Sequence, residues 1–235
     1  MPDIKLWYSS GACSLAPHVL LHEICVPFDA VETSFAKAAH LTDEFARINP
    51  KKRLPVLSLD GEVITEVPAI ATAIADLVPE RHLMGRTALD RVRVYEWMNW
   101  LSGTMHGQGF GGLWRPERFS DDLAAFDSIR ARGRRTILEC FELIESKVTS
   151  PYSTGGSFTA VDPYLLVFYR WGNGIGIDMP KTCPSYTAFA QGLVQRESVA
   201  AALAAEGISG QSLKDQVPPM DTATWAAPSS KENVS

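Results

Sequence analysis

The hydrophobic pattern changes in character near residue 80, and this change limits what the chain can fold into more than any other feature. Before it, runs rich in β-branched and aromatic residues alternate with helical spacing of apolar residues, in the order β-α-β-α-β-β-α. The expected strands lie at 4–8, 28–33, 55–59 and 62–65, and the expected helices at 14–25, 43–47 and 68–77. Beyond it the spacing is helical throughout. The pattern therefore predicts an α+β protein, with an α/β domain at 1–80 and an all-α helical domain at 87–208.

The helical part carries its own start signals. Thr87 and Asp90 have the spacing of a helix-capping pair, and Thr159 and Asp162 repeat that spacing before the next apolar run, with Phe158 placed as a hydrophobic staple. The expected helices run over 87–106, 121–147, 159–171, 185–193 and 198–205. Five helices without an intervening strand predict an all-helical domain.

Composition narrows the class of protein. With 235 residues, 46% apolar and 21% charged, the chain is long enough to bury a sizeable core, and a net charge of −5 argues against nucleic acid as the main partner. We expect no membrane-spanning helix and no secretory signal, and hence a cytoplasmic protein. Residues 209–235 are polar and contain three prolines, which predicts a mobile tail, or alternatively a lid over the site anchored by Trp225.

Four cysteines are spaced neither as a zinc site nor as a disulfide framework, so we expect no metal. Cys25, Cys140 and Cys183 are expected to be buried small hydrophobes. Cys13 differs, because residues 9–14 join the first strand to the first helix and place Cys13 and Ser14 at a helix N-terminus. Unpaired N–H groups and the helix dipole favour an anion there.

This position predicts a thiol site. The N-terminus can lower the pKa of Cys13 below the free value of ~8.5, or serve a thiol brought in by a ligand. Tyr8, Ser9, Ser10 and Ser14 are rival hydroxyls that could hydrogen-bond such a thiolate. The alternatives are a packed cysteine at a strand end and ordinary capping and turn residues.

Two more segments carry candidate binding groups. Leu54 precedes Pro55 and a strand, so an extended Leu54 can offer its N–H and C=O to a ligand's backbone. Glu66 places a carboxylate at the start of the helix that Pro68 opens. Taken alone, Leu54–Pro55 and Glu66 also fit ordinary turn and capping features, and the basic run at 51–53 also fits a solvated surface.

A polar stripe marks the first helix of the helical domain. Asn99 and His106 lie seven apart, with Ser102 and Gly103 between them, and in a mostly buried helix such a stripe needs a ligand or another subunit as its partner. The alternative for His106 is a satisfied histidine at a domain interface.

Four glycines follow this stripe, and no strand precedes them, so they are not a phosphate-binding loop. We expect them to end or kink the helix and to widen a cleft. Four large apolar residues are then candidates for the wall of a second-substrate pocket, with plain core packing as the alternative: Met105, Phe110, Trp114 and Trp171.

Taken together, the motifs resemble those of cytosolic glutathione transferases, most closely the bacterial beta class and its fungal relatives. The resemblance covers nearly the whole chain from about residue 4 to 208. Six segments carry it in the same order: Gly11-Ala12-Cys13-Ser14-Leu15-Ala16-Pro17-His18, Ile48-Asn49-Pro50, Leu54-Pro55, Thr65-Glu66, Glu96-Trp97-Met98-Asn99-Trp100-Leu101 with His106, and Phe158-Thr159-Ala160-Val161-Asp162-Pro163-Tyr164-Leu165.

The resemblance implies a thioredoxin-like N-terminal domain that holds glutathione, an all-helical domain that lines the second-substrate site, and a homodimer. It implies that Cys13 and His106 lie near the glutathione sulfur, with Asn99 among the glutathione-binding residues. Further binding roles follow by position: Leu54 before a cis Pro55 for the cysteinyl backbone, Glu66 and Val67 for the γ-glutamyl group, and Lys37, Lys52 and Arg53 for the glycyl carboxylate.

Three positions depart from the family pattern. Val67 stands where Ser or Gly is usual, Ser102 lies beside the expected serine position, and Gly107 replaces an expected lysine.

The predicted function is activation of the glutathione thiol, by Cys13, Ser14, His106 and Ser10, for addition to an electrophilic, largely apolar small molecule. One alternative is a glutathione-dependent cis-trans isomerase that adds the thiol reversibly to a conjugated double bond, in secondary metabolism for example. Two others are a monothiol disulfide reductase that uses Cys13 and a non-catalytic binding module on the same fold.

Overall fold

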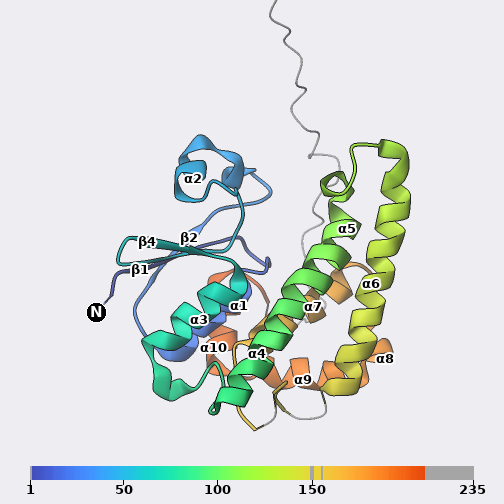
Figure 1. Cartoon of the computed structure of the whole chain (residues 1–235). Coiled ribbons are helices and arrows are strands. Elements are labelled where there is room, and N and C mark those ends of the chain that lie inside the picture. The colour runs from blue at the N-terminus through green and yellow to red at the C-terminus, as the bar shows by residue number, and fades with distance from the viewer. Residues whose placement is uncertain (1, 149–150, 155, 210–235) are drawn as a thin grey trace, which may run out of the picture.

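A four-stranded sheet with helices on both faces forms the N-terminal part of the protein, and helices form the rest (Figure 1). The computed structural model describes residues 2–148, 151–154 and 156–209. The elements of the first part are β1 (Ile4–Tyr8), α1 (Leu15–Ile24), β2 (Asp29–Glu32), η1 (Ala39–Leu41), α2 (Asp43–Ile48), β3 (Val56–Leu59), β4 (Glu62–Thr65), α3 (Val67–Leu77) and η2 (Pro79–Arg81). This order confirms the predicted β-α-β-α-β-β-α pattern.

The sheet has the strand order β2-β1-β3-β4, with β1 parallel to β2 and antiparallel to β3. Leu6, at the centre of β1, is paired with Ala30 of β2 and Leu57 of β3. Leu6 and Leu57 belong to the main core with α1 and α3, whereas Val56 belongs to a smaller cluster with residues of α2. Alternation along the strands therefore supplies one face to α1 and α3 and the other to α2, as Figure 1 shows.

The helical part is built around α7. Its elements are α4 (Ala88–Trp100), η3 (Leu101–Phe110), α5 (Gly111–Trp114), η4 (Pro116–Arg118), η5 (Leu123–Ala125), α6 (Phe126–Lys147), α7 (Val161–Gly174), α8 (Met179–Thr182), α9 (Pro184–Val194) and α10 (Glu197–Ala205). Every residue of α7 from Val161 to Gly172 is buried. A helix that is buried on all sides forms the centre of a bundle, and the α+β class is confirmed.

The glycine-rich stretch does not end the first helix of this part. The chain passes from α4 into the π-helix η3 and then into α5, so the expected end of the helix at Gly107 to Gly112 is wrong, while the alternative, a kink at these glycines, stays a prediction. These glycines serve close packing: a Cβ at Gly133 of α6 would lie 2.7 Å from the Gly109 carbonyl oxygen and the Leu113 nitrogen. Only backbones without side chains approach so closely, and α6 therefore packs directly on η3 and α5.

Side-chain caps mark the starts of α4 and of the short turn η5. Thr87 Oγ1 accepts the Asp90 N–H at 3.1 Å, and Asp90 accepts the Thr87 N–H at 2.9 Å, which confirms the predicted capping pair. The predicted helix at 121–147 begins only at Phe126, because Asp122 Oδ1 accepts the Ala124 N–H at 2.9 Å and caps a separate 3₁₀ turn.

At the start of α7, Asp162 accepts the Thr159 N–H at 2.6 Å, which is the hydrogen bond that the predicted capping box requires of its carboxylate.

Cys140 and Cys183 are buried, as predicted. The prediction for Cys25 is wrong: it is exposed, because it terminates α1 in a left-handed conformation (φ 56°) at the surface.

None of the helices in the described part of the chain combines the length and apolar character that a bilayer-crossing helix requires. The domain limits at 1–80 and 87–208 stay a prediction, and the predicted tail from residue 210 onward, with Trp225, lies outside the described residues.

Candidate functional site

The loop before α1 is held by its own hydroxyl groups. Ser14 Oγ donates to the Ser9 carbonyl and accepts the Ser9 N–H, both at 3.1 Å. Ser10 Oγ donates to the Glu206 carbonyl at 2.6 Å, and the Gly11 N–H donates to Glu206 Oε2 at 2.8 Å. The assignment of Ser10 and Ser14 as thiol-activating hydroxyls is therefore corrected: both hydroxyls fix the loop that carries Cys13.

Cys13 lies at the N-terminus of α1 as predicted, but its thiol is buried. The residue is 5% exposed, and its Sγ–H donates to the Leu54 carbonyl at 3.6 Å. Burial raises the pKa of the Cys13 thiol to about 12, although Arg115 and the N–H groups of Cys13 and Ser14 act to lower it. The expected low pKa of Cys13 is wrong, because removal from water outweighs the helix N-terminus.

No hydrogen bond joins the Tyr8 hydroxyl to Cys13 among the described residues. Its side chain is buried in the main core, with its ring 5.0 Å from the His18 ring on the α1 side of the sheet. Burial, followed by the charges of Glu32 and Glu206, raises the pKa of its hydroxyl. Tyr8 is therefore a core residue and not a rival thiol activator.

Tyr164 and His106 approach the site from the helical domain. The Tyr164 hydroxyl lies 3.5 Å from His106 Nδ1 and also interacts with Ser102. Burial lowers the pKa of His106 to about 4, with Arg115 as the next cause, so that the ring is neutral at pH 7. Burial raises the pKa of Tyr164, and the electrostatic influence of the nearby Cys13 adds to this rise. The histidine is thus a neutral hydrogen-bonding group beside the site.

The structure joins the two domains directly at the loop before α1. Trp171 Nε1 of α7 donates to the Gly11 carbonyl at 3.0 Å, and the His106 ring centroid lies 5.1 Å from that of Trp171. Tyr164 was not among the residues predicted for the site. The signal was its hydroxyl in a helix predicted to be buried, because a buried tyrosine needs a hydrogen-bond partner.

Leu54 occupies the predicted position next to Cys13. The Leu54–Pro55 peptide bond is cis, as the family pattern implies. Asn49 fixes the loop that precedes Leu54: its Nδ2 donates to the Arg53 carbonyl at 2.7 Å, and its Oδ1 accepts the Lys51 N–H at 3.1 Å. The motif Ile48-Asn49-Pro50 thus has a structural reason, since its asparagine shapes the loop that presents Leu54.

Glu66 stands at the start of α3 with a positive φ of 73° and an exposed carboxylate. This carboxylate pairs with Lys51 Nζ, which also donates to Thr65 Oγ1 at 2.6 Å, and it acts electrostatically on Cys13. Val67 follows as the first residue of the helix and is buried, so that its backbone N–H is the group it can offer a ligand.

The predicted cations are not all brought together. Lys52 Nζ donates to the Leu41 carbonyl at 3.2 Å, and Lys37 is exposed. Arg53, in contrast, lies close enough to Arg115 and Arg118 to lower the pKa of both, after burial as the first cause. Arg115 and Arg118 were missed in the sequence, because their place beside Cys13 depends on how the two domains pack.

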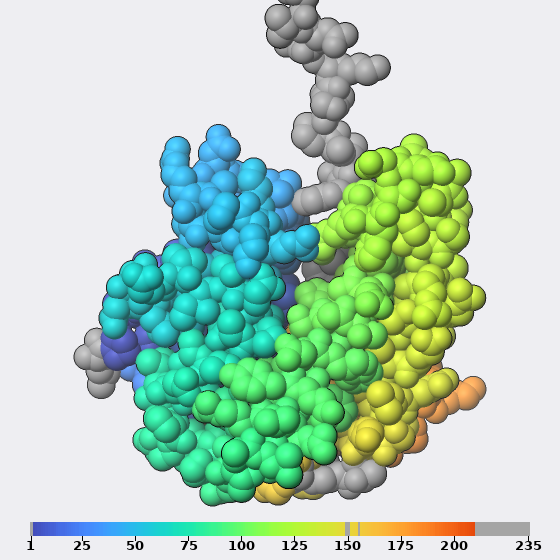
Figure 2. Space-filling view, viewed as in Figure 1, coloured from blue at the N-terminus to red at the C-terminus, as the bar shows by residue number. Residues whose placement is uncertain are grey.

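A notch between the domains opens toward these residues. Figure 2 shows it between the blue segment that contains α2 and the yellow-green segment that contains α5 and η4. Arg115 Cζ lies 5.9 Å from the centroid of the Phe35 ring, which belongs to the opposite wall. Arg53 of the first domain and Arg115 and Arg118 of the second thus bring positive charge together where the two domains meet.

Asn99 does not share the site of His106. It is exposed and lines a groove of about 600 Å³ with Thr72 of α3 and Tyr95 of α4. The predicted stripe fails because residues 101–110 are π-helical: bonds from i to i+5 place more residues in each turn, so that a spacing of seven no longer returns to the same face.

The predicted apolar wall is mostly core. Met105 and Phe110 have no exposed surface, and Trp171 is 3% exposed, so these three side chains pack inside the helical domain. The assignment of these three residues to a pocket wall is corrected: plain core packing, the alternative, applies to them. Trp114 is half-buried, 4.9 Å from the Trp171 ring, and remains available to a ligand.

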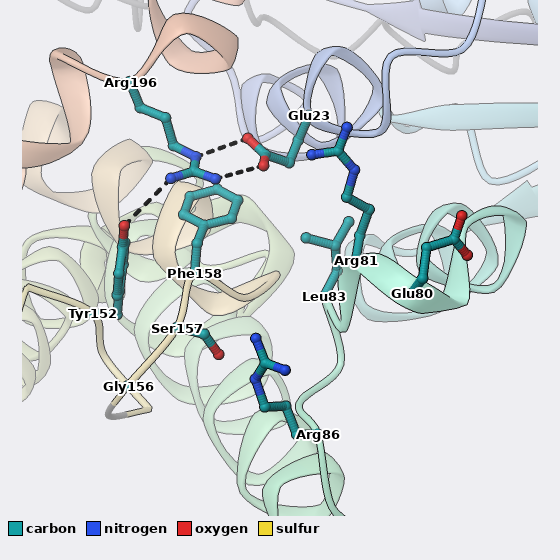
Figure 3. Close-up of a pocket in the computed structure, with 10 residues that line it drawn as sticks. All are labelled: Glu23, Glu80, Arg81, Leu83, Arg86, Tyr152, Gly156, Ser157, Phe158 and Arg196. Carbon is teal, nitrogen blue, oxygen red and sulfur yellow. Dashed lines mark hydrogen bonds and ion pairs between the residues drawn. The ribbon is translucent and has the colours of Figure 1, made fainter.

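A second cavity, of about 330 Å³, lies at the opposite end of α1 (Figure 3). In it, Arg196 donates to both carboxylate oxygens of Glu23, at 2.7 and 2.5 Å, and Ser198 Oγ donates at 2.6 Å. Burial acts to raise the pKa of Glu23, but Arg196 and Ser198 outweigh it and hold that pKa low. This paired cluster ties α1 to α10 and is structural.

Comparison with known proteins defines the family. Residues 2–76 match the model described as glutathione S-transferase, N-terminal domain. Over 208 residues the chain is 31% identical to glutathione S-transferase GstA of Escherichia coli O157:H7, a match that covers 87% of this chain and 100% of that protein.

Two solved structures are also similar. A glutathione transferase homologue from Sulfitobacter with bound glutathione has a TM-score of 0.83 at 29% identity, covering 89% of this chain and 100% of that one. The bacterial beta class glutathione S-transferase of Sphingomonas chungbukensis has a TM-score of 0.76 at 33% identity, covering 87% and 100%. The chain belongs to the glutathione S-transferase family, which confirms the thioredoxin-like N-terminal domain and the all-helical domain that follows it.

Proposed function

We propose that this protein is a glutathione S-transferase that binds glutathione in the notch between its domains and adds its sulfur to an electrophilic small molecule. The observation that carries the proposal is the meeting of three groups from separate segments: the N-terminus of α1 at Cys13, the carbonyl of Leu54 before the cis Pro55, and the carboxylate of Glu66 at the start of α3. Leu54 offers its backbone to the cysteinyl part, and Glu66 and Val67 hold the γ-glutamyl part. Lys37, Lys52 and Arg53 meet the glycyl carboxylate.

In the reaction the glutathione thiol gives its proton to water, and the sulfur forms a bond to the electrophilic carbon. Either a leaving group departs with its bonding electrons, or the electrons of a conjugated double bond move to the next carbon, which takes up a proton. The positive ends of α1 and α3 and the nearby arginines stabilise the thiolate. Because a ligand's sulfur in the notch is less buried than Cys13, this field acts on it without the same desolvation.

Cys13 is in this proposal a neutral neighbour of the glutathione sulfur. A thiol with a pKa of about 12 is a poor attacking group for disulfide exchange, which needs the thiolate, so the transferase is favoured over the monothiol reductase. His106 and Tyr164 lie next to this position and offer neutral hydrogen bonds.

Calorimetric titration with glutathione tests the binding site. We expect Glu66→Gln to weaken binding about tenfold, the loss of one charge-assisted contact to the γ-glutamyl ammonium. The matched control is Glu62→Gln, an exposed glutamate at the start of β4 that carries the same charge. Absence of glutathione binding at millimolar concentrations, or equal effects of the two variants, would contradict the proposal.

A cis-trans isomerase is the second candidate, favoured by one relative. The maleylacetoacetate isomerase of Dictyostelium discoideum is 22% identical over 178 residues, covering 74% of this chain and 80% of that protein. The same site serves both reactions, since elimination of glutathione after rotation about the new single bond returns an isomerised product. Labelled glutathione with a conjugated diene separates them: net consumption supports transfer, and product without consumption supports isomerisation.

The proposal includes a homodimer in the cytoplasm, where glutathione is kept reduced. The groove between α3 and α4, on the face turned toward the viewer in Figure 2, and the exposed Val63, Leu89 and Val92 support a second copy as the partner of this face. Light scattering on a sizing column tests it: the protein is expected at twice its chain mass, and Val92→Glu at the mass of one chain. A wild-type monomer would contradict it.

A further inference from the structure

The side chain of Tyr164 joins the centre of the helical domain to the candidate site. Tyr164 lies near the start of α7 and has no exposed surface. Its ring packs on that of Phe168, one turn further along the helix, with the ring centroids 4.8 Å apart. Its hydroxyl lies 3.5 Å from Nδ1 of His106, which belongs to η3. Because a buried hydroxyl needs a hydrogen-bond partner, this contact ties the tyrosine to the histidine.

The ring of His106 is also held by aromatic neighbours. It makes edge contacts with Phe168 and Trp171, at centroid distances of 6.1 and 5.1 Å. Trp171 in turn donates to the Gly11 carbonyl at 3.0 Å, two residues before Cys13. These contacts place the ring close to the loop before α1. His106 is only half-buried, so that part of the residue stays open to a ligand.

The two ring nitrogens of His106 differ in their surroundings. Burial, followed by the charge of Arg115, lowers the pKa of His106 to about 4, so the ring is neutral at pH 7 and carries one proton. Among the described residues, Nδ1 is the ring nitrogen with a hydrogen-bond partner, and that partner is the Tyr164 hydroxyl. When this hydroxyl donates, Nδ1 is the acceptor and the proton lies on Nε2, which can then donate to a ligand.

Ser102 indicates the direction of this hydrogen bond. Burial raises the pKa of Tyr164, and a hydrogen bond with the Ser102 side chain acts against this rise. A bond donated to the phenol oxygen has this effect, because it stabilises the phenolate. With its oxygen accepting from Ser102, the tyrosine keeps its own O–H for Nδ1 of His106. Each bond of the series is then donated toward the histidine.

We propose that Tyr164 is a positioning residue for the reaction: by donating to Nδ1 of His106, its hydroxyl holds the ring in the tautomer whose Nε2–H donates to the sulfur of bound glutathione. The contact to the sulfur rests on the proposed transferase function. A neutral N–H donor stabilises the thiolate by a charge-assisted hydrogen bond and needs no protonated histidine. The proton stays on Nε2, and the thiol proton goes to water.

Turnover of glutathione with chlorodinitrobenzene tests the effect on the reaction. The C–S bond forms, the C–Cl bond breaks and chloride leaves. Tyr164→Phe keeps the ring and removes the hydroxyl, so kcat is expected to fall about fivefold while the KM for glutathione stays within about twofold. The matched control is Tyr169→Phe, which removes another buried hydroxyl of α7, one that donates to Thr187 Oγ1 at 3.0 Å. It is expected to stay within about twofold of wild type, and equal losses in the two variants would overturn the proposal.

A double variant shows whether Tyr164 acts through His106. His106→Phe retains a ring beside Trp171 and has no ring nitrogen. In that background Tyr164→Phe is expected to change kcat by less than about twofold, because the group that the hydroxyl orients is already absent. The same fivefold loss in both backgrounds would show that the tyrosine acts independently of the histidine and would overturn the proposal.

The position of the proton is measured without turnover. Long-range proton–nitrogen NMR spectra at pH 7 distinguish a protonated from an unprotonated ring nitrogen, and His106→Phe identifies the signals of His106 among the five histidines. In wild type the proton is expected on Nε2. Tyr164→Phe is expected to shift the Nδ1 signal toward that of a nitrogen without a hydrogen bond, and Tyr169→Phe to leave it in place.

These spectra keep the inference separate from the proposed function. If wild type does not consume glutathione, the transferase function fails, and the spectra still decide whether Tyr164 fixes the tautomer. A proton on Nδ1 in wild type would overturn the inference, and so would an Nδ1 signal that is the same in wild type and Tyr164→Phe.

Discussion

The two ends of α1 use charge in opposite ways. At its C-terminal end, the carboxylate of Glu23 receives Arg196 and Ser198, and the Arg196 guanidinium also lies 4.3 Å above the Phe158 ring. At its N-terminal end, Arg53, Arg115 and Arg118 crowd a notch around a neutral Cys13. Complementary charges that satisfy each other hold the domains together at the C-terminal end, whereas at the N-terminal end three like charges lie close enough to lower the pKa of Arg115 and Arg118. The difference separates a structural cavity from a binding site although both contain arginine.

The largest expected contrast is between the two cysteines at these ends. Cys25 is exposed and Cys13 is 5% exposed with a pKa of about 12. At pH 8 we expect iodoacetamide to modify Cys25 at least about a hundredfold faster than Cys13, because the thiolate is the reacting species. Peptide mapping after a short pulse measures both rates. Comparable rates would mean that the positive notch ionises Cys13 after all.

The second contrast concerns stability at the paired end. Glu23→Ala is expected to lower the free energy of unfolding by about 2–3 kcal/mol, because it leaves Arg196 and Ser198 without their acceptor; the figure is reduced because Arg196 is partly exposed. Urea unfolding measures it. Glu80→Ala, at the rim of the same cavity, is the control and is expected to stay within about 0.5 kcal/mol. Equal losses would show that the pairing is not what stabilises this end.

The third contrast is between the pH ranges in which His106 and Glu23 change the free energy of unfolding. The folded pKa of His106 is about 4, below its unfolded value of ~6.5, so the unfolded state binds the proton first and stability falls as the pH falls through that interval. We expect a loss of about 1–2 kcal/mol by pH 5 relative to His106→Asn. Asp162, whose pKa burial raises to about 6, acts in the opposite direction in both proteins, so the difference isolates His106.

Glu23 is the comparison for His106, because it is expected to leave the stability between pH 7 and 5 unaffected. Its pKa is held below the ordinary value of 4.5, so the stability it contributes is complete above that value and is lost only as the pH falls further. Thermal unfolding between pH 7 and 5 is therefore expected to have the same slope in wild type and in Glu23→Gln. If the stability of His106→Asn depended on pH between 7 and 5 in the same way as that of wild type, the assigned burial of the histidine would be contradicted.

The smallest expected effect is on stability at the crowded end. Arg118→Gln is expected to leave the free energy of unfolding unchanged or raise it by less than about 1 kcal/mol, because it relieves only the repulsion from Arg115 and Arg53, which solvent partly screens. Urea unfolding at low and high salt measures it, with the gain confined to low salt. A loss of more than about 1 kcal/mol would make Arg118 a structural residue like Arg196.

Local signals in the sequence predicted the fold well. The strands, the capping pair Thr87–Asp90 and the buried α7 follow from periodicity and capping, which depend on neighbours along the chain. The helix N-terminus at Cys13 and the approach of Leu54 were also predictable, because a strand-to-helix turn and an extended residue before proline are local features. Asn99 was misplaced because nothing in the sequence announced that the helix would widen into a π-helix at Leu101.

The charge of the site was not predictable in this way. Burial of Cys13 and the convergence of Arg53 with Arg115 depend on how the two domains pack, and the sign of the pKa shift of Cys13 is decided by desolvation, a property of the whole fold. A helix N-terminus alone argues for an ionised thiol. The packed structure argues for a neutral Cys13 next to a positive notch that acts on a ligand.

The pKa of the glutathione thiol in the binary complex tests this central claim most directly. It is measured by following thiolate absorbance in an ultraviolet difference titration, with Cys13→Ala to remove the protein's own nearby thiol. The account predicts that bound glutathione ionises at least about one pH unit below the free thiol value of ~8.5, and that Arg115→Gln reverses part of this shift while Arg86→Gln does not. A bound thiol with an unshifted pKa, or a shift that survives unchanged in Arg115→Gln, would contradict it.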